Sequence, residues 1–328
     1  MFKVTIALSV YNVAEYVRAS LDSIRAQTFK DFELLCIDDA STDSTWAILE
    51  EYAAKDNRIR LFRQEKNQGL SVSRNLAIKE AKGEYLLMLD GDDLFAPNMV
   101  EKAYTTAKEK DADMVMWDYV SFYDKKDISA KSAKPSALLN INVQDKLSLL
   151  RRPAFSPSRM TRLSVLRDLQ IHFPEGLTKQ DIPVHWKLVT SIDKIALIPE
   201  YFLYYRQSPS NTTSRKGRSV FSLAYVMDIT KQQLIEDGHY ETYKNEFLRS
   251  RLSLLQGMYD HIKTELKDEA MALVKERLGE DEKAYISNPK NELTPRTRNF
   301  YGMLNVSLLA TLKYRGFNMI RSIYRKIK

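Results

Sequence analysis

The sequence predicts an α/β fold: a doubly wound, mostly parallel sheet with helices on both faces, followed by a smaller all-helical C-terminal region. From residue 3 to about residue 120, short apolar runs alternate with amphipathic stretches. This alternation is typical of parallel strands joined by crossover helices. After residue 218 the pattern changes to long helical stretches. Because 328 residues exceed one typical domain, we predict a sheet domain at 1–215 and a helical domain at 216–328.

Five short apolar runs are the predicted strands of the first domain. They are Lys3–Val10, Glu33–Ile37, Arg58–Phe62, Tyr85–Leu89 and Met114–Val120. The amphipathic stretches between them are predicted helices: Val13–Gln27, Asp43–Ala54, Ser71–Ala81 and Asn98–Glu109. Residues 124–140 are rich in Lys and Ser, so we expect an exposed loop there.

The remaining elements are predicted from weaker patterns. In the first domain they are helices near Val143–Leu150 and Thr178–Val189 and strands at Ile195–Pro199 and Tyr201–Tyr205. Residues 153–162 contain two prolines and show no clear period, which leaves them unassigned. In the second domain the predicted helices are Val220–Glu236, Glu241–Lys263, Lys267–Leu278 and a last region, Phe300–Lys328.

Composition argues against several classes of protein. The single Cys36 cannot form an intramolecular disulfide, and with four scattered histidines no zinc-ligand cluster is visible. No signal peptide is recognisable at the start of the chain. No apolar run approaches the roughly 20 residues that a membrane-spanning helix needs. We therefore expect a cytoplasmic protein that does not cross a membrane.

The positive charge is concentrated at the C-terminus. Nine Lys and Arg lie between Lys290 and Lys328, against Glu292 alone. On a helical wheel of residues 317–328, apolar and basic side chains separate onto two halves. Such a helix suits a surface of anionic lipids, so we expect peripheral membrane contact through residues 300–328. The alternative is a helix packed on its own domain; no nucleic-acid motif accompanies the charge.

An acidic turn follows the most apolar of the predicted strands. Tyr85–Leu89 is succeeded directly by Asp90-Gly91-Asp92-Asp93. Three carboxylates at the carboxyl end of a buried strand repel one another unless a cation neutralises them. This edge of a doubly wound sheet is also where ligands bind, and a divalent ion holding a phosphate-bearing ligand fits these oxygens. The alternative is that Asp is simply common in turns.

The positions of the glycines exclude two common classes of phosphate-binding site. No two of the ten glycines are two residues apart, and no Gly-Lys-Ser/Thr occurs. Dinucleotide dehydrogenases and P-loop NTPases are therefore excluded. A second Asp-x-Asp occurs at Asp111-Ala112-Asp113, but it precedes its predicted strand and so belongs at the opposite edge of the sheet. We assign the metal site to Asp90 and Asp92 only.

Several longer segments of the chain are informative together, including VTIALSVYN at 4–12, NQGLSVSRNLAI at 67–78 and GEYLLMLDGDDLFAP at 83–97. These segments resemble the family 2 glycosyltransferases, which have the GT-A fold. The resemblance implies an inverting transfer of a sugar from a nucleotide donor, expected to be a UDP-sugar. The acceptor would be a hydroxyl of a glycan or lipid-linked glycan, and the implied cofactor is Mn²⁺ or Mg²⁺.

The resemblance also implies roles for individual residues. Those expected at the nucleotide sugar are Ser9, Tyr11, Asn12, Asp39, Arg74, Asp90 and Arg206. Asp39 would bind the uracil ring, and Arg74 would lie near the donor phosphates or sugar. Asp92 would hold the ion that bridges the diphosphate, and Asp90 would approach that ion or the ribose.

An inverting transfer further needs a general base. In this family the base is usually the Asp of a Glu-Asp pair that opens a helix after the sheet, and Asp181 matches that position. Gln180 stands where Glu is common. The alternative for Asp181 is an acid favoured by the helix dipole. His185 is interpreted as structural, and Arg206 either approaches the diphosphate or belongs to a packed strand.

Two rival functions stay open at this point. A sugar-nucleotide nucleotidyltransferase would share the sheet but should carry a Gly-rich amino-terminal signature, which is absent here. A catalytically silent nucleotide-sugar-binding protein is the other alternative, if Gln180 marks a loss of function. Release of UDP in the presence of an acceptor would separate an enzyme from such a binding protein.

Overall fold

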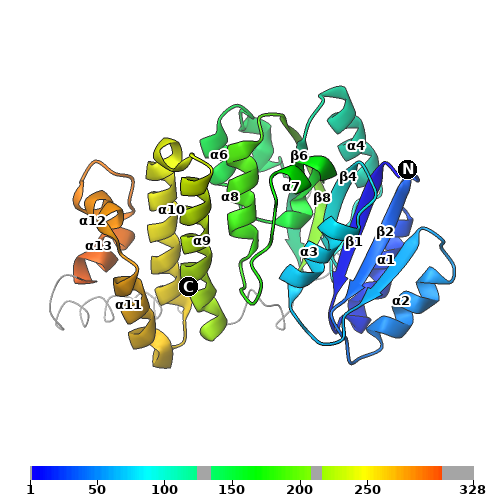
Figure 1. Ribbon diagram of the computed structural model, residues 1–328, viewed down its shortest axis with the longest axis horizontal. Helices are drawn as coiled ribbons and strands as arrows, with labels where there is room; N and C mark the ends of the chain where they lie inside the picture. Colours follow the sequence, from blue (N-terminus) through cyan, green and yellow to red (C-terminus); the bar gives the residue numbers. More distant parts are fainter. Residues whose placement is uncertain (1, 124–133, 208–215, 305–328) are drawn as a thin grey trace. The chain divides into compact units, whose positions relative to one another are not determined.

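The chain divides into two compact units, residues 1–214 and 215–328. The computed structural model describes residues 2–123, 134–207 and 216–304. The first unit contains a sheet with helices on both faces, and the described part of the second unit is helical (Figure 1). The division falls beside the boundary near residue 215 that the sequence suggests.

A mixed, mostly parallel sheet forms the centre of the first unit. Its strands are β1 (Val4–Val10), β2 (Phe32–Asp38), β3 (Ile59–Arg63), β4 (Tyr85–Asp90), β5 (Leu94–Phe95), β6 (Met114–Phe122), β7 (Arg159–Arg162) and β8 (Ile195–Arg206). Their order is β3-β2-β1-β4-β7-β6-β8-β5. Only β5 and β7 of these strands run antiparallel to their neighbours. The predicted fold class is confirmed.

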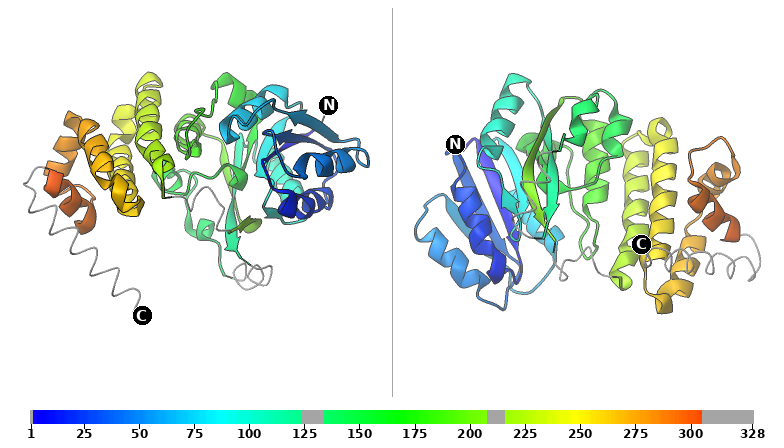
Figure 2. Two further views of the ribbon diagram at one scale, coloured as in Figure 1. Left: turned by 90° about the horizontal axis from the view of Figure 1, so that it is seen from below. Right: turned by 180° about the vertical axis from the view of Figure 1, so that it is seen from behind.

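Helices cover both faces of the sheet. Residues of α1 (Ala14–Arg25), α2 (Thr45–Ala53) and α4 (Met99–Glu109) join one apolar core. On the other face α3 (Leu70–Glu80) contacts β1, β2 and β4, and α7 (Leu163–Asp168) contacts β7 (Figure 2). Next to them α6 (Lys146–Leu150) contacts α8 (Asp181–Ser191).

Alternation along β4 aims its last side chain at the α3 face. Tyr85, Leu87 and Leu89 belong to the core that is shared with α1 and α4. Because successive side chains of a strand point to opposite faces, Asp90 lies on the other face, towards α3. The continuous apolar run therefore ends in a carboxylate placed at the carboxyl edge of the sheet.

The turn after β4 needs glycine because it packs against the end of β1. A Cβ on Gly91 would lie 2.5 Å from Val10 Cγ1 and 3.3 Å from the carbonyl oxygen of Ser9. The N–H of Gly91 donates to that carbonyl at 3.0 Å. A side chain at this position would push the acidic turn away from β1, so the glycine fixes where its acids lie.

Several elements differ from the sequence-based expectation, among them β5 and α7, which the sequence did not predict. Residues 153–162, for which the sequence predicts no regular element, contain the antiparallel β7, which is too short to show a period. The two strands expected at 195–205 are the single strand β8, because Pro199 sits in a bulge opposite Trp117 and Asp118. Helix α8 starts at Asp181 rather than Thr178, since Lys179 adopts a left-handed conformation with φ of 63°.

The second unit is built around one long helix. Its helices are α9 (Ser222–Glu236), α10 (Tyr240–His261), α11 (Lys267–Glu276), α12 (Glu280–Ser287) and α13 (Pro295–Leu304), and α10 contacts each of the others. Arg251 Nε lies 3.2 Å from Glu282 Oε1, and both side chains are buried. Phe300 and Tyr301 of α13 are buried as well.

The predicted amphipathic tail helix, residues 317–328, lies outside the described residues. Within the described ranges, no helix combines the length and the apolar character that crossing a bilayer requires.

Candidate active site

The guanidinium of Arg74 lies between two carboxylates at the carboxyl edge of the sheet. Its Nη1 donates to Asp181 Oδ1 at 2.8 Å, and its Nη2 donates to Asp90 Oδ1 at 3.2 Å. The Arg74 side chain is only 2% exposed, and its guanidinium carbon lies 5.4 Å from the centre of the Phe173 ring. Folding thus brings α3, β4 and α8 together through one buried cation, although Arg74 and Asp181 are 107 positions apart.

Asp39, at the end of β2, fixes the beginning of α3. Its carboxylate accepts hydrogen bonds from the N–H groups of Gln68 and Gly69, at 2.8 and 2.7 Å, and from Asn67 Nδ2 at 2.9 Å. Gly69 has a φ of 91°, which favours glycine. Asp39 therefore holds the loop that leads into the Arg74 helix, and its contact with uracil stays a prediction.

Helix α3 also holds the segment that leads to Asp181. Asn75 accepts from the N–H of Phe173 at 2.8 Å and donates to its carbonyl at 3.0 Å. The Ser71 hydroxyl donates to the carbonyl of Pro174 at 2.7 Å. The same helix thus supplies the cation between the two carboxylates and anchors the chain shortly before α8 begins.

Asp181 is the first residue of α8, and several donors converge on its Oδ1. Besides Arg74, the N–H of Ser156 donates to this oxygen at 3.2 Å, and the Ser156 hydroxyl donates to it as well. Burial raises the pKa of Asp181, but the charge of Arg74, the Ser156 hydrogen bond and the charge of Arg159 together bring it below its usual value. The side chain is therefore an ionised carboxylate at neutral pH, the form in which it can accept a proton.

The three acids of the turn after β4 have different surroundings. Asp93 is fully buried, and its Oδ1 accepts a hydrogen bond from the N–H of Arg206 at 2.8 Å. The Nε of Arg206 donates to the carbonyl oxygen of Asp92 at 2.7 Å, while its guanidinium carbon lies 4.6 Å from the centre of the Tyr16 ring. Asp93 and Arg206 support the turn, which leaves Asp90 and Asp92 as its more accessible acids.

Asp90 and Asp92 have the character of ligands for a hard divalent cation. Burial and the nearby charge of Asp90 raise the pKa of Asp92 to about 6. Crowded carboxylates of this kind are stabilised by a cation. No group of three or more His, Cys, Asp or Glu poised for a metal occurs within the described ranges. Diphosphate oxygens and water would have to complete the coordination, as is usual for Mg²⁺.

The predicted residues at the end of β1 have unequal surroundings. Ser9 is opposite Asp90 in the parallel register and is buried. Asn12 has a φ of 51°, and its Oδ1 accepts from the N–H of Thr42 at 2.8 Å, so its side chain holds a neighbouring loop. Tyr11 is 46% exposed, which leaves its ring accessible to a base or a sugar.

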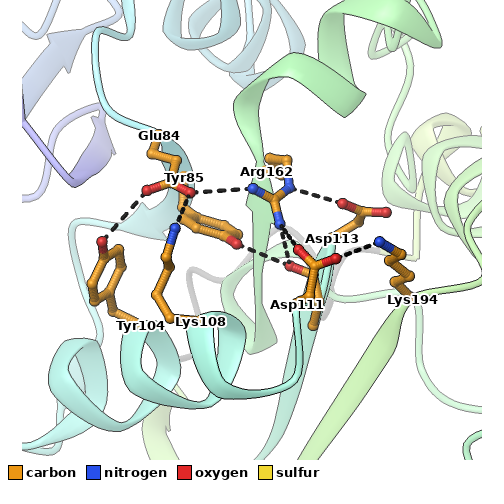
Figure 3. A network of polar contacts seen from close by, with 9 residues as sticks. Glu84, Tyr85, Tyr104, Lys108, Asp111, Asp113, Arg162 and Lys194 are labelled. Carbon is orange, nitrogen blue, oxygen red and sulfur yellow. Dashed lines mark hydrogen bonds and ion pairs between the residues drawn. The ribbon is translucent and has the colours of Figure 1, made fainter.

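The second Asp-x-Asp lies in a network of ion pairs at the opposite edge of the sheet (Figure 3). Arg162 Nε donates to Asp113 Oδ1 at 2.8 Å, and its Nη2 donates to Asp111 Oδ1 at 3.2 Å. Lys194 pairs with the other oxygen of Asp111. Both carboxylates are thus neutralised by side-chain cations at the amino end of β6, which confirms the prediction that this motif lies at the opposite edge of the sheet.

Comparison with known sequences decides the family. The sequence profile of glycosyl transferase family 2 matches residues 5–169, about half of the chain. The chain belongs to this family. The glycosyltransferase GlyG of Streptococcus pneumoniae is 25% identical over 241 residues, which are 70% of this chain and 77% of GlyG. TarS of Staphylococcus aureus, a poly(ribitol-phosphate) beta-N-acetylglucosaminyltransferase, is 26% identical over 288 residues, 82% of this chain and 48% of TarS.

The structure of this chain is similar to solved structures that have the GT-A fold. S. aureus TarS 1–349 in complex with UDP-GlcNAc has a TM-score of 0.59 at 20% identity, covering 87% of this chain and 91% of that one. The mannosyltransferase PcManGT from Pyrobaculum calidifontis, in complex with GDP-Man and Mn²⁺, has a TM-score of 0.53 at 17% identity. The match covers 95% of this chain and 86% of the PcManGT chain.

The glycosyltransferase fold brings two further residues to Asp181 that sequence reasoning missed. Ser156 lies in a short turn before β7, and Arg159 is the first residue of β7. Because β7 runs antiparallel to β4, its beginning lies towards the carboxyl end of β4, where Met160 pairs with Leu87. The Ser-Pro-Ser-Arg sequence at 156–159 carries no recognisable motif, so no local signal indicates either residue.

Proposed function

We propose that this glycosyltransferase moves a sugar from a UDP-sugar to a hydroxyl of a glycan acceptor, with inversion and with Asp181 as the general base. The observation that carries the proposal is the buried Arg74, which joins the carboxylate of Asp181 to the turn containing Asp90 and Asp92. The proposed base, Asp181, then lies on one side of the Arg74 guanidinium. The acidic turn proposed to hold the metal ion and the diphosphate lies on the other side.

The proposed reaction is a single displacement. Asp181 takes the proton of the acceptor hydroxyl while that oxygen forms a bond to the anomeric carbon of the donor sugar. The bond between the anomeric carbon and the UDP oxygen breaks on the opposite side, so the configuration inverts and UDP leaves with its electron pair. Arg74 keeps Asp181 ionised before the reaction.

The leaving-group side of the site contains Asp90, Asp92 and Arg206. A divalent ion held by the two aspartates would neutralise the charge that develops on the diphosphate. Arg206 orders the turn through the Asp92 carbonyl and the Asp93 carboxylate. Tyr11 and Asp39 are proposed to contact the nucleoside, because both lie at the carboxyl edge of β1 and β2.

The relatives support the donor and acceptor classes. TarS has been solved in complex with UDP-GlcNAc, and PcManGT has been solved in complex with GDP-Man and Mn²⁺. TarS is named as a transferase that acts on poly(ribitol-phosphate). We propose a UDP-sugar donor and a surface or lipid-linked glycan acceptor for this chain. UDP release from a panel of UDP-sugars with glycan acceptors tests this, and no transfer from any of them would contradict it.

Replacing Asp92 by Ala should weaken Mn²⁺-dependent binding of UDP by at least about tenfold, because the diphosphate complex loses a carboxylate ligand. Calorimetry with UDP, with and without Mn²⁺, measures the effect. Asp111→Ala is the matched control, since it removes an acid from the other Asp-x-Asp and should leave UDP affinity unchanged. Equal affinities of Asp92→Ala and the wild type would place the metal ligand elsewhere.

Membrane-surface contact of the tail is proposed from its sequence. A test deletion should begin at residue 305, because Phe300 and Tyr301 are buried in the second unit. Removal of 305–328 should lower partitioning onto vesicles with anionic lipids by roughly tenfold or more, since each basic residue near such a surface contributes about 1 kcal/mol. Sedimentation with vesicles measures this. Unchanged partitioning of the shortened protein would rule the proposal out.

A further inference from the structure

We infer that Ser156, Arg159 and His185 form a hydrogen-bonded chain that clamps Oδ1 of Asp181 and leaves Oδ2 as the oxygen that takes the acceptor proton. The inference rests on the proposed role of Asp181 as the base. The three residues are positioning residues, because they act through Asp181.

The two oxygens of Asp181 have different surroundings. Arg74 Nη1, the Ser156 N–H and the Ser156 hydroxyl all donate to Oδ1. Among the described residues none donates a hydrogen bond to Oδ2. A carboxylate held in this way keeps one orientation and presents its second oxygen with its lone pairs available. Oδ2 is thus the atom that an acceptor hydroxyl can reach as a hydrogen-bond donor.

Arg159 fixes the direction of the Ser156 hydroxyl. Its Nη2 donates to Ser156 Oγ at 3.0 Å, and both side chains are buried. A guanidinium has no acceptor atom, so the serine oxygen must accept at this contact. The hydroxyl hydrogen is then directed towards Asp181 Oδ1. The chain of donors runs from Arg159 through Ser156 to Asp181.

His185 fixes Arg159 in turn. Its Nε2 lies 3.1 Å from the carbonyl oxygen of Leu149, which can only accept, so Nε2 carries the hydrogen. Its Nδ1 then accepts from Arg159 Nη1 at 3.2 Å. Burial and the charge of Arg159 lower the pKa of His185 to about 3, which keeps the ring neutral as this arrangement requires. His185 lies one helical turn after Asp181 on α8, so both ends of the chain are on one helix.

The charge of Arg159 strengthens this chain. Within the described ranges no carboxylate lies within ion-pair distance of Arg159, and its hydrogen-bond partners are the neutral groups of Ser156 and His185. Burial lowers the pKa of Arg159 to about 10, which still leaves it protonated at neutral pH. A buried positive charge behind the serine oxygen polarises the hydroxyl and favours its hydrogen bond to an anion.

Ser156→Ala should lower kcat of sugar transfer about tenfold or more, the effect expected for losing a hydrogen bond to a charged group. KM for the UDP-sugar should stay within about twofold, because Ser156 contacts the base and none of the residues proposed for the donor. Ser156→Thr should keep most of the wild-type kcat, since threonine also has a hydroxyl group. Ser156 is among the residues that line a cavity of about 20 Å³, so there is unfilled space beside this position.

Ser158→Ala is the matched control for local packing. Ser158 is a buried serine of the same turn, but its hydroxyl donates to the carbonyl of Phe155 at 2.8 Å. This variant should keep kcat within about twofold of wild type. If Ser158→Ala lost as much activity as Ser156→Ala, or if Ser156→Ala kept the wild-type kcat, the clamp would be overturned.

Crystal structures of the wild type, Ser156→Ala and Ser156→Thr keep this test separate from the proposed function. The clamp predicts that the Asp181 carboxylate rotates or takes a second rotamer in Ser156→Ala and keeps its orientation in Ser156→Thr. If the wild type transfers no sugar but this rotation occurs, the proposed function fails and the clamp stands. An unmoved carboxylate in Ser156→Ala overturns the clamp whether or not the enzyme is active.

Discussion

Replacing Asp181 by Asn is expected to lower kcat of sugar transfer by roughly a hundred- to ten-thousand-fold, the range typical of losing a general base. Binding of UDP with Mn²⁺ should stay within about threefold of wild type. The side-chain oxygen of Asn can still accept the hydrogen bonds of Arg74 and Ser156, whereas its NH₂ group cannot take a proton. Steady-state kinetics and calorimetry measure the two effects on one preparation.

Asp193→Asn is a suitable control for this experiment. Asp193 lies shortly after the other end of α8, pairs with Lys146, and is 91% exposed. The same chemical change at this position should leave kcat and UDP affinity at wild-type values. Wild-type turnover of Asp181→Asn would assign the base to another residue and would remove the basis of the proposed mechanism.

The second large effect is expected for Arg74→Met, which should lower the free energy of unfolding by about 3–5 kcal/mol. Met fills a similar volume, but it leaves Asp90 and Asp181 facing each other in a poorly solvated site without their shared cation. Burial already raises the pKa of Asp90 even with Arg74 present. Sugar transfer should be lost as well, because both carboxylates will repack or take up protons.

Urea denaturation followed by tryptophan fluorescence reports this effect for the first unit alone, because all three tryptophans, Trp46, Trp117 and Trp186, lie in it. Arg18→Met is the control: its ion pair with Glu51 is exposed, so its removal should cause no measurable loss of stability. A stability of Arg74→Met equal to wild type would mean that the two carboxylates are solvated or already protonated.

The sheet and its helices could be predicted from sequence because their signals are local. A strand buried on both faces, such as Tyr85–Leu89, leaves a continuous apolar run, and each crossover helix leaves an amphipathic pattern. The position of Asp90 was expected for a related reason, since it directly follows a predicted strand, whereas Asp181 was expected only from the resemblance to the family. The short β7 and the bulge at Pro199 have no such pattern, and tertiary pairing alone stabilises them.

Sequence reasoning was also limited in what it could say about contacts. It predicted that Arg74 lies near the donor, which stays a prediction, but it could not show that the guanidinium contacts Asp90 and Asp181. It left Asp93 out of the metal site, but it could not show that the fold buries Asp93 against the backbone of Arg206. In both cases the deciding interaction joins residues far apart in the chain, so no local pattern could reveal it.

By itself the sequence determined the fold class, the family and the strand edge where the acids gather, because periodicity and motif spacing record which residues each element buries. Only the tertiary structure decided how the charges pair. Whether a carboxylate lies beside a guanidinium, a backbone N–H or another carboxylate depends on distances of a few ångströms between separate elements. The antiparallel β7 is the clearest case, since it brings Ser156 and Arg159 to an edge that their place in the sequence does not suggest.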